Sequence, residues 1–288
     1  MKSKEDESMK TAMKWLSLVL ALVMTLSLAS SALAYTDKNL EAPKAQDVVI
    51  DGDLGEWDLS RSLRIVEKSQ IIDQIEHWDG EADCAMDVSV MWDEENLYFG
   101  ITISDADPFV YREGFPLDEL DAIIFFLSTD PNADPDRTEY TATDWRWTSS
   151  VEDYYGDWFN YIDRDMIADN QGYETAGEYG DELLFEDGDY EAAFQKITSE
   201  SGKTVGATYE IKLPLHYLAN ENIPQLVPEA GQTIGFDFSI LDVDLPCPGI
   251  HSLRMQYSAD LTTTGDRKPE MHDVDHNPSL WATLTFVD

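Results

Sequence analysis

Apolar residues recur at every second position in two neighbouring stretches, 87–92 and 97–104. A period of two places one set of side chains on a buried face and the other set outward, so both stretches are predicted strands. The turn-forming sequence DEEN at 93–96 separates them and predicts a hairpin. A third stretch, 122–127, is apolar at every position, which is typical of a strand in the middle of a sandwich.

The second half of the chain shows the same alternation. Residues 192–198 and 205–213 predict a hairpin that turns at Ser201 and Gly202, and apolar residues alternate again over 234–240. A last strand is expected over 280–286, short strands over 48–50 and 63–66, and one helical turn over 214–219, where Pro suits the first helical position. Together these elements predict an all-β fold, an antiparallel and jelly-roll-like β-sandwich.

The stretch from about residue 130 to residue 190 interrupts this succession of strands. It carries large aromatic residues among acidic ones and ends in a segment rich in Gly, Glu and Asp. We expect one or two strands within 138–149, a short helix within 158–167 and extended loops after it. A long excursion inside a compact domain is more often functional than idle.

Residues 1–34 have the pattern of a secretory signal peptide. Two lysines precede the apolar stretch 15–28, and Ala32-Leu33-Ala34 supplies a cleavage site with small residues. A membrane-spanning helix is the alternative, but the apolar stretch is shorter than the roughly 20 residues that a span needs. We therefore expect a mature chain that starts at Tyr35, is secreted or held at the cell surface, and forms one domain over 35–288.

The chain is strongly acidic, with a net charge of −39, or −40 without residues 1–34, which hold four Lys and three acidic residues. Such a charge repels phosphate backbones and anionic lipids. The composition thus predicts no nucleic-acid partner and no membrane insertion, and it suits neutral ligands or cations. Adaptation to a salty environment is the alternative explanation of the acidic excess.

Six segments, in this order along the chain, resemble the family nine carbohydrate-binding modules, which fall within the wider group of DOMON-like β-sandwiches. They are IDGDLGEW (50–57), HWDGEADCAMDVSVMWDEENLYFGITISDADP (77–108), DAIIFF (121–126), YEIKLPL (209–215), GQTIGFDFSILDVD (231–244) and NPSLWATLTF (277–286). The resemblance covers nearly the whole mature chain apart from 130–189. It implies a calcium-supported sandwich that binds polysaccharide or sugar ends, usually beside a glycoside hydrolase.

The resemblance also implies that the sugar lies between two Trp rings, helped by polar side chains that include an Arg matched by Arg146. The positions of the two Trp fall near Asp118 and Asp275 in this chain. We therefore expect a relocated binding surface on the excursion, because aromatic rings give large contact area at low entropic cost. The candidate ligand-binding residues are Trp145, Arg146, Trp147, Tyr155 and Trp158.

A satellite core beneath the excursion is the alternative role for these aromatic residues. Trp145 and Trp147 share a parity, so on a regular strand they share one face. Arg146 would then point to the other face, unless the strand bulges.

Acidic residues at strand ends and in one loop predict at least one structural calcium ion, as the resemblance also implies. Carboxylates buried together without a cation are costly. The loop 130–136 alternates oxygen ligands as a calcium loop does, but the closing Glu of that pattern is missing, so a solvated turn is its alternative. The candidate ligands are Asp51, Asp53, Asp105, Asp107, Asp130 and Asp134, and Asp242 with Asp244 forms a further strand-end pair.

The two cysteines, Cys84 and Cys247, are predicted to form a disulfide in an oxidising exterior, with two free thiols as the alternative. The sequence has no G-x-S-x-G motif, no zinc-protease spacing and no covalent-haem motif, which disfavours catalysis. An acidic pair for glycoside hydrolysis carries little information in a chain with this many acids.

The sequence thus predicts a secreted, non-catalytic domain that binds a neutral polysaccharide or oligosaccharide, in polysaccharide breakdown, with a glycoside hydrolase as an expected partner. Two alternatives stay open. One is a haem or electron-transfer domain of the DOMON-like group, and the other is a calcium-dependent structural surface protein that has lost the sugar site.

Overall fold

Strands dominate the computed structural model, which describes residues 39–73, 75–105, 121–150, 161–165, 191–219, 223–243, 253–259 and 277–288, with the side chains of 147–150 and 161–165 excepted. The predicted signal peptide and the start of the predicted domain, residues 35–38, lie outside the described residues. The described strands belong to one compact unit, Asn39–Asp288. Within the described residues, no helix is both long enough and apolar enough to cross a bilayer.

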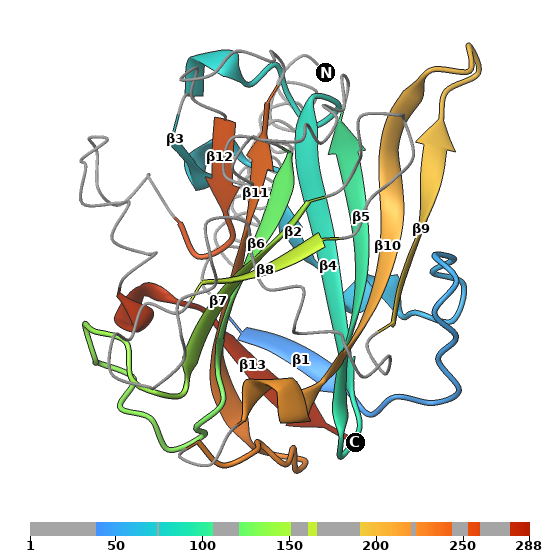
Figure 1. The fold of residues 1–288 in the computed structure, drawn as a ribbon. Coiled ribbons are helices and arrows are strands. Elements are labelled where there is room, and N and C mark those ends of the chain that lie inside the picture. Colours follow the sequence, from blue (N-terminus) through green and yellow to red (C-terminus); the bar gives the residue numbers. More distant parts are fainter. Residues whose placement is uncertain are drawn as a thin grey trace, which may run out of the picture. The chain divides into compact units, whose positions relative to one another are not determined.

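Two sheets form the fold (Figure 1). One has five strands in the order β2-β4-β5-β10-β9. They are β2 (Leu63–Ile65), β4 (Cys84–Trp92), β5 (Asn96–Asp105), β10 (Thr204–Pro214) and β9 (Glu191–Thr198). The predicted hairpin over 87–104 is confirmed as the antiparallel pair β4–β5.

The other sheet has eight strands, with the main order β1-β13-β11-β6-β7-β8, while β12 pairs with β11 and β3. Its strands are β1 (Asn39–Pro43), β13 (Thr283–Val287), β11 (Thr233–Asp242), β6 (Ala122–Ser128), β7 (Asp144–Ser150), β8 (Tyr161–Asp165), β12 (Leu253–Gln256) and β3 (Ile71–Asp73). The pairing of β1 with β13 is parallel, and the other ladders of this sheet are antiparallel.

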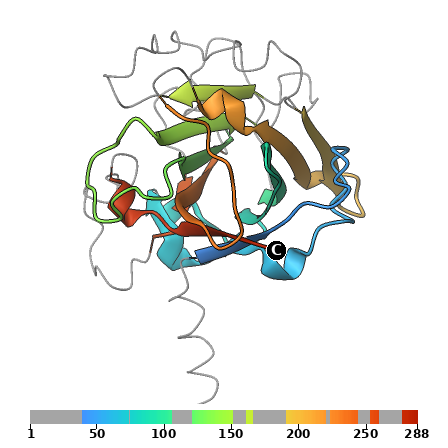
Figure 2. The same cartoon turned by 90° about the horizontal axis from the view of Figure 1, so that it is seen from below.

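The main core lies between the two sheets, which Figure 2 views nearly along the strands. Phe99 of β5 packs on Phe125 of β6 and on Phe236 of β11, with ring centroids 5.1 Å and 6.2 Å apart. Burial of these rings from both layers is the main driving force that holds two sheets face to face. The predicted β-sandwich is confirmed.

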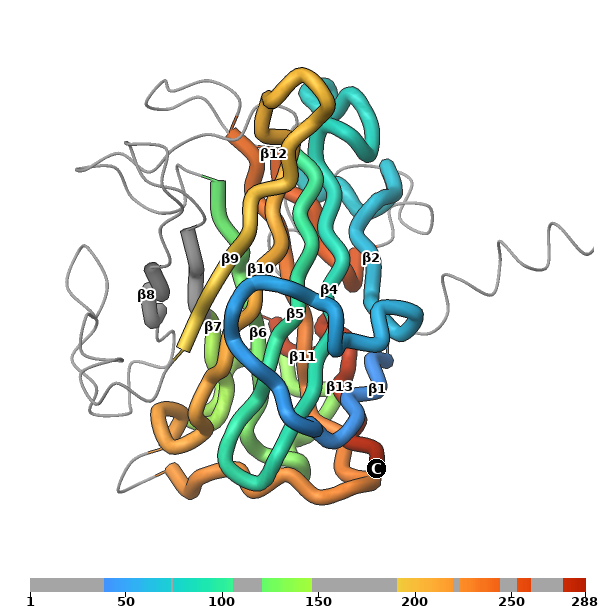
Figure 3. The backbone as a smooth tube through the Cα atoms, turned by 90° about the vertical axis from the view of Figure 1, so that its right-hand side faces the viewer, coloured from blue at the N-terminus to red at the C-terminus, as the bar shows by residue number. Residues whose placement is uncertain are grey.

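Two predicted elements differ from the structure. Residues 48–50 form no strand, because they belong to a segment over 44–58, here called the strap, that crosses the five-stranded sheet (Figure 3). Part of the predicted helix within 158–167 is the strand β8, whose residue Ile162 pairs with Ser149 of β7. The turn predicted over 214–219 is confirmed as a 3-10 helix, Leu215–Leu218.

The strap is fixed by a buried carboxylate rather than by a strand ladder. Glu210 of β10 accepts hydrogen bonds from the backbone of Asp51 and Gly52, at 2.8 Å and 2.7 Å, and from the indole Nε1 of Trp57 at 2.7 Å. Trp57 lies over Gly100 of β5, where a Cβ atom would stand 2.5 Å from the indole ring. This packing explains the glycine within an otherwise regular strand.

Candidate functional site

The face of the eight-stranded sheet that points away from the main core carries the candidate site and is called the outer face below. Strand parity defines it: Phe126 of β6 pairs with Arg146 of β7 on one side and with Asp237 of β11 on the other. Their strand neighbours Phe125 and Trp145 belong to the main core. Arg146, Phe126 and Asp237 therefore form one cross-strand row on the outer face.

A second apolar cluster covers part of the outer face. Trp281 packs on Phe126 and on Tyr140, with ring centroids 5.5 Å and 5.3 Å apart and tilts of 42° and 50°. The buried members of this cluster are Ala122, Ile124, Phe126, Leu241 and Trp281. Tyr140 is only half-buried, so part of its surface is open to solvent. The outer face thus offers a partly exposed aromatic side chain on a rigid apolar base.

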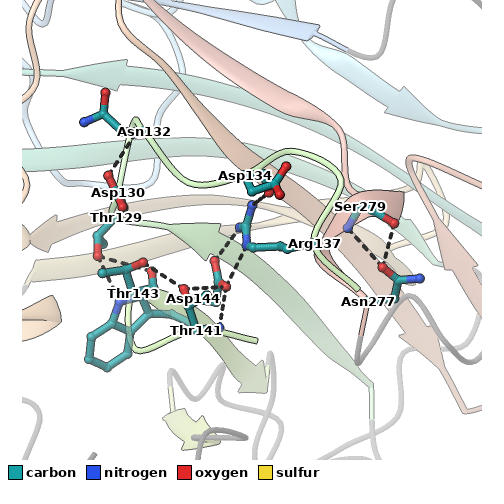
Figure 4. Close-up of polar contacts among 11 residues, drawn as sticks. Thr129, Asp130, Asn132, Asp134, Arg137, Thr141, Thr143, Asp144, Asn277 and Ser279 are labelled. Atoms are coloured by element: carbon teal, nitrogen blue, oxygen red, sulfur yellow. Dashed lines mark hydrogen bonds and ion pairs between the residues drawn. The ribbon is translucent and has the colours of Figure 1, made fainter. Parts of the chain in front are cut away.

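The loop between β6 and β7, residues 129–143, carries Tyr140 and is held by a buried ion pair between Arg137 and Asp144, which Figure 4 shows. Arg137 donates to both carboxylate oxygens of Asp144, at 2.9 Å and 2.5 Å, and the Asp144 side chain is fully buried. Asp144 also accepts from the backbone and the hydroxyl of Thr141. A bidentate pair of this kind fixes geometry as well as charge, so it makes the loop around Tyr140 rigid.

The same loop is tied to the chain just before β13. The Arg137 carbonyl accepts a hydrogen bond of 3.0 Å from the backbone of Ser279, and the Arg137 guanidinium lies 6.0 Å from the centre of the Trp281 ring. Asn277 caps the short 3-10 helix Pro278–Leu280 by accepting from Ser279. The predicted final strand and the loop at 130–136 therefore meet at one edge of the outer face.

A buried polar network lies next to this aromatic group, on β11 and β12. Asp237 accepts hydrogen bonds from Gln256 Nε2 at 3.1 Å and from the backbone of Phe238 and Ser258. Burial raises the pKa of Asp237 to about 6, although these donors favour the charged form. Polar side chains packed so completely on a sheet face specify one arrangement of the strands.

Arg254 brings a positive charge into this network. Its Nη2 donates to Ser239 Oγ at 3.1 Å and to Gln256 Oε1 at 3.3 Å, so Gln256 links the Arg254 guanidinium to the Asp237 carboxylate. A buried charge is tolerated when it is hydrogen-bonded in this way.

Of the predicted ligand-binding residues, Arg146 lies on the outer face and is half-buried, as its parity predicted. Trp145 is not available for stacking: it is 2% exposed in the main core, and its indole Nε1 donates to Thr129 Oγ1 at 3.3 Å. The reason is strand parity, which turns Trp145 toward the other sheet. The side chain of Trp147, as well as Tyr155 and Trp158, lies outside the described residues. Within the part of the chain that the structure describes, Tyr140 and Trp281 lie on this face together with Phe126, although neither was among the predicted ligand-binding residues.

The candidate metal centre lies at the end of β5, where the two sheets meet. Carboxylate oxygens of Asp105, Asp121 and Asp242 all lie within 4.8 Å of one another, and the three residues are 6%, 3% and 4% exposed. Three oxygen ligands at this spacing suit a hard divalent cation such as calcium. Three buried negative charges so close together are costly without a cation, so the donor set fits the predicted ion.

This centre contains one predicted ligand, Asp105, and also Asp242 of the further strand-end pair, while Asp107 and Asp244 lie outside the described residues. Asp121 was not among the predicted ligands. The sequence feature that could have indicated it is an acidic residue directly before an apolar strand. In the structure, Asp121 Oδ1 accepts a hydrogen bond of 2.7 Å from the backbone of Val243, next to Asp242.

The four other predicted ligands are not brought together in the structure. Each accepts a hydrogen bond from the backbone two residues further on: Asp51 from Asp53, Asp53 from Gly55, Asp130 from Asn132 and Asp134 from Asp136. These are local turn contacts of a kind typical of Asp in loops. Among the described residues, only the group around Asp105 has the spacing of a metal site.

Cys84 lies opposite Asp105 in the β4–β5 ladder and is a buried free cysteine in the described structure. Burial, together with the charges of Asp242, Asp105 and Asp121, raises the pKa of its thiol well above the usual value. Cys247 lies outside the described residues, so the predicted disulfide stays a prediction.

No protein-family model matches the chain, and no curated protein matches it. Its fold is similar to a family nine carbohydrate-binding module from Caldicellulosiruptor kristjanssonii in complex with glucose, with a TM-score of 0.52 at 15% identity over 86% of this chain and 95% of that chain. A structure from the same organism in complex with cellotriose has a TM-score of 0.49 at 16% identity, over 86% and 93%. The predicted resemblance is confirmed at the level of the fold: this chain has a β-sandwich similar to that of the glucose-bound module.

Proposed function

We propose that the protein is a non-catalytic domain that binds a neutral glycan on the outer face of the eight-stranded sheet. The observation that carries the proposal is the row on this face in which half-buried Arg146 lies opposite Phe126. Trp281 packs on Phe126, and half-buried Tyr140 packs on Trp281. An aromatic side chain next to a hydrogen-bonding cation is the combination that a sugar ring requires. The fold of a sugar-binding module supports the same function.

The side chains on this face have different roles, which follow from their chemistry. The Tyr140 ring supplies an apolar surface for the C–H groups of a sugar, and Arg146 donates hydrogen bonds to its hydroxyl groups. The loop that carries Tyr140 is held by the buried Arg137–Asp144 pair, so little entropy is lost when a ligand is bound. A neutral ligand also avoids repulsion from a chain with a net charge of −39.

We further propose that residues 1–34 direct secretion, that the ligand is a polysaccharide under breakdown, and that a glycoside hydrolase acts beside this domain. Calcium is the cation proposed for Asp105, Asp121 and Asp242. Calcium would supply positive charge there, and the carboxylates of these residues would hold it.

The binding test uses the mature chain from Tyr35 on a glycan array, followed by calorimetry with glucose and cellotriose as first probes. We expect binding of neutral glycans and a loss of about tenfold or more in affinity in Arg146→Ala, because a hydrogen bond to a charged group contributes about 1.5–3 kcal/mol. Tyr140→Ala is expected to weaken binding. Tyr140→Phe is expected to retain the part of the affinity that comes from contact between the aromatic ring and the sugar.

Arg64→Ala is the matched control, because Arg64 is an exposed arginine of β2 on the other sheet, paired with Asp87 and Glu81. It should bind as the wild type does. Equal affinity of Arg146→Ala and Arg64→Ala would show that the outer face is not the site. A mature chain that binds no neutral glycan in the presence of calcium would contradict the function itself and favour a structural surface protein.

A further inference from the structure

Gln256 joins two buried groups of opposite charge on the outer face. Its Nε2 donates to Asp237 Oδ2 at 3.1 Å, and its Oε1 accepts from Arg254 Nη2 at 3.3 Å and from Ser239 Oγ at 2.7 Å. All four side chains are buried, and the most exposed of them, Arg254, is 7% exposed. Water has little access to this network, so each of its polar groups depends on its protein partners.

While Asp237 is ionised, the chemistry of the network allows only one orientation of the Gln256 amide. A carboxylate only accepts hydrogen bonds, and a guanidinium only donates them. The NH2 group of Gln256 must therefore face Asp237, and its carbonyl oxygen must face Arg254. The orientation of this one amide is thus tied to the charge of Asp237.

Protonation of Asp237 reverses one of these requirements. Asp237 Oδ1 accepts from the backbone of Phe238 and Ser258, at 2.8 Å and 3.3 Å, which favours the proton on Oδ2, the oxygen that faces Gln256. The O–H group then points at an NH2 group, which also donates. If the amide turns over, its NH2 group faces the guanidinium of Arg254 instead. Gln256 therefore cannot satisfy both charged neighbours once Asp237 carries a proton.

The surroundings of Asp237 allow it to change charge in a mild pH range. Burial raises its pKa to about 6. Next to it β6 presents the apolar Phe126, and beyond that ring β7 presents Arg146. On the other side β12 presents Arg254, whose partner in the ladder with β3 is Asp73. Two cations and one further acid therefore surround the carboxylate.

The same change of charge reaches Arg146, the cation of the proposed glycan site. Adjacent strands lie about 4.8 Å apart, so Asp237 and Arg146 are about 10 Å apart across Phe126. Charges at this distance still interact, because buried groups are screened less than exposed ones. Ionised Asp237 offsets the repulsion between Arg146 and Arg254, and so it helps to hold Arg146 on the sheet face.

We propose that the charge of Asp237 is transmitted through the Gln256 amide to Arg254 as a pH switch, and that glycan binding at Arg146 is stronger when Asp237 is ionised. The glycan part rests on the proposed function, whereas the switch does not. Coupling is reciprocal: the factor by which ionisation raises glycan affinity equals the factor by which bound glycan favours ionisation. Couplings of this kind are about 5- to 150-fold.

The switch is tested by nuclear magnetic resonance of the ¹⁵N-labelled mature chain from pH 5 to pH 7.5. The side-chain resonances of Gln256 and Arg254 are expected to shift together, with a midpoint near pH 6. In Asp237→Asn both should keep their low-pH positions throughout, because the Asn side chain presents an NH2 group where the protonated acid presents its O–H. Wild-type resonances that do not move would overturn the switch, and this measurement needs no variant to fold.

The role of the amide has its own test in Gln256→Met, which keeps the length of the side chain and removes both hydrogen-bonding ends. The Arg254 resonances should then lose most of their pH response. A response of full size in this variant would show that Arg254 senses the charge directly and would overturn the transmission through Gln256. Asp134→Asn is the control, since Asp134 is an exposed turn residue, and it should titrate as the wild type does.

The effect on binding is tested by calorimetry with cellotriose at pH 5 and pH 7.5. The wild type and Asp134→Asn are expected to bind at least about fivefold more tightly at pH 7.5, and Asp237→Asn to bind equally weakly at both. Equal wild-type affinities would overturn the regulation and leave the switch standing. If no glycan binds at either pH, the regulation falls with the proposed function, while the resonances still decide the switch.

Discussion

Single residues of this protein are placed by the parity of the strand on which they lie. On β7, Arg146 lies on the outer face, and its neighbour Trp145 is sealed between the sheets. On β11, the same alternation puts Phe236 and Phe238 into the core and leaves Asp237 on the outer face. A polar residue in this position is then buried, and its ionisation becomes coupled to folding.

Asp237 gives a prediction for the pH dependence of stability. Its pKa is about 6 in the folded chain, above the usual value of 3.8, because burial disfavours the charged form. The folded state therefore binds this proton more tightly than the unfolded state does. The stability that the proton contributes is present below about pH 4 and is lost as the pH rises through about 6.

Asp237→Asn should remove this contribution to the pH dependence. The free energy of unfolding, measured with urea at pH 5 and pH 7.5, should then fall less on going to the higher pH than it does in the wild type. Asp134→Asn, at an exposed turn, should keep the wild-type difference. A pH dependence in Asp237→Asn equal to that of the wild type would show that Asp237 does not titrate in this range.

At the scale of elements, the strands could be predicted from the sequence. The contacts between distant residues that hold the strap and bring the acidic strand ends together could not. Alternation over 87–104 and 234–240 predicts β4, β5 and β11, because one buried face imposes a period of two. The strap has no such period, since the side chain of Glu210 takes the place of a ladder partner. Alternation likewise cannot show that Asp105, Asp121 and Asp242 meet, because they are 16 to 137 residues apart and only the order of the strands joins them.

The packing of the strap on β5 predicts the effect of one added methyl group. Gly100→Ala would place a Cβ atom 2.5 Å from the Trp57 ring, so the ring must move and its hydrogen bond to Glu210 weakens. We expect a loss of about 1–3 kcal/mol in the free energy of unfolding, measured with urea, and faster proteolysis within the strap. Gly55→Ala is the control in the same segment, because the atoms nearest its added Cβ begin at 3.4 Å and belong to the Asp53 side chain. Equal stability of Gly100→Ala and the wild type would show that Trp57 is loosely held.

At the scale of the whole molecule, charge is the dominant feature. A net charge of −39 destabilises the compact state through self-repulsion, and it acts on every part of the sandwich at once. Ion pairs such as Lys44–Glu94 and Lys212–Glu191 lie at or near the surface and contribute little against this excess. Screening by salt should therefore stabilise the protein more than screening weakens its ion pairs.

This balance predicts that monovalent salt raises the melting temperature. The screening length falls from about 30 Å at 0.01 M to about 8 Å at 0.15 M, so repulsion between distant acidic residues is removed first. The measurement is thermal unfolding of the mature chain over this range of sodium chloride in the presence of a chelator, which separates general screening from the binding of divalent cations. In the same series Asp121→Asn should keep the salt dependence, because it removes only one of many acidic charges. A melting temperature that falls as salt is added would mean that the local ion pairs, rather than the net charge, control the stability of the folded chain.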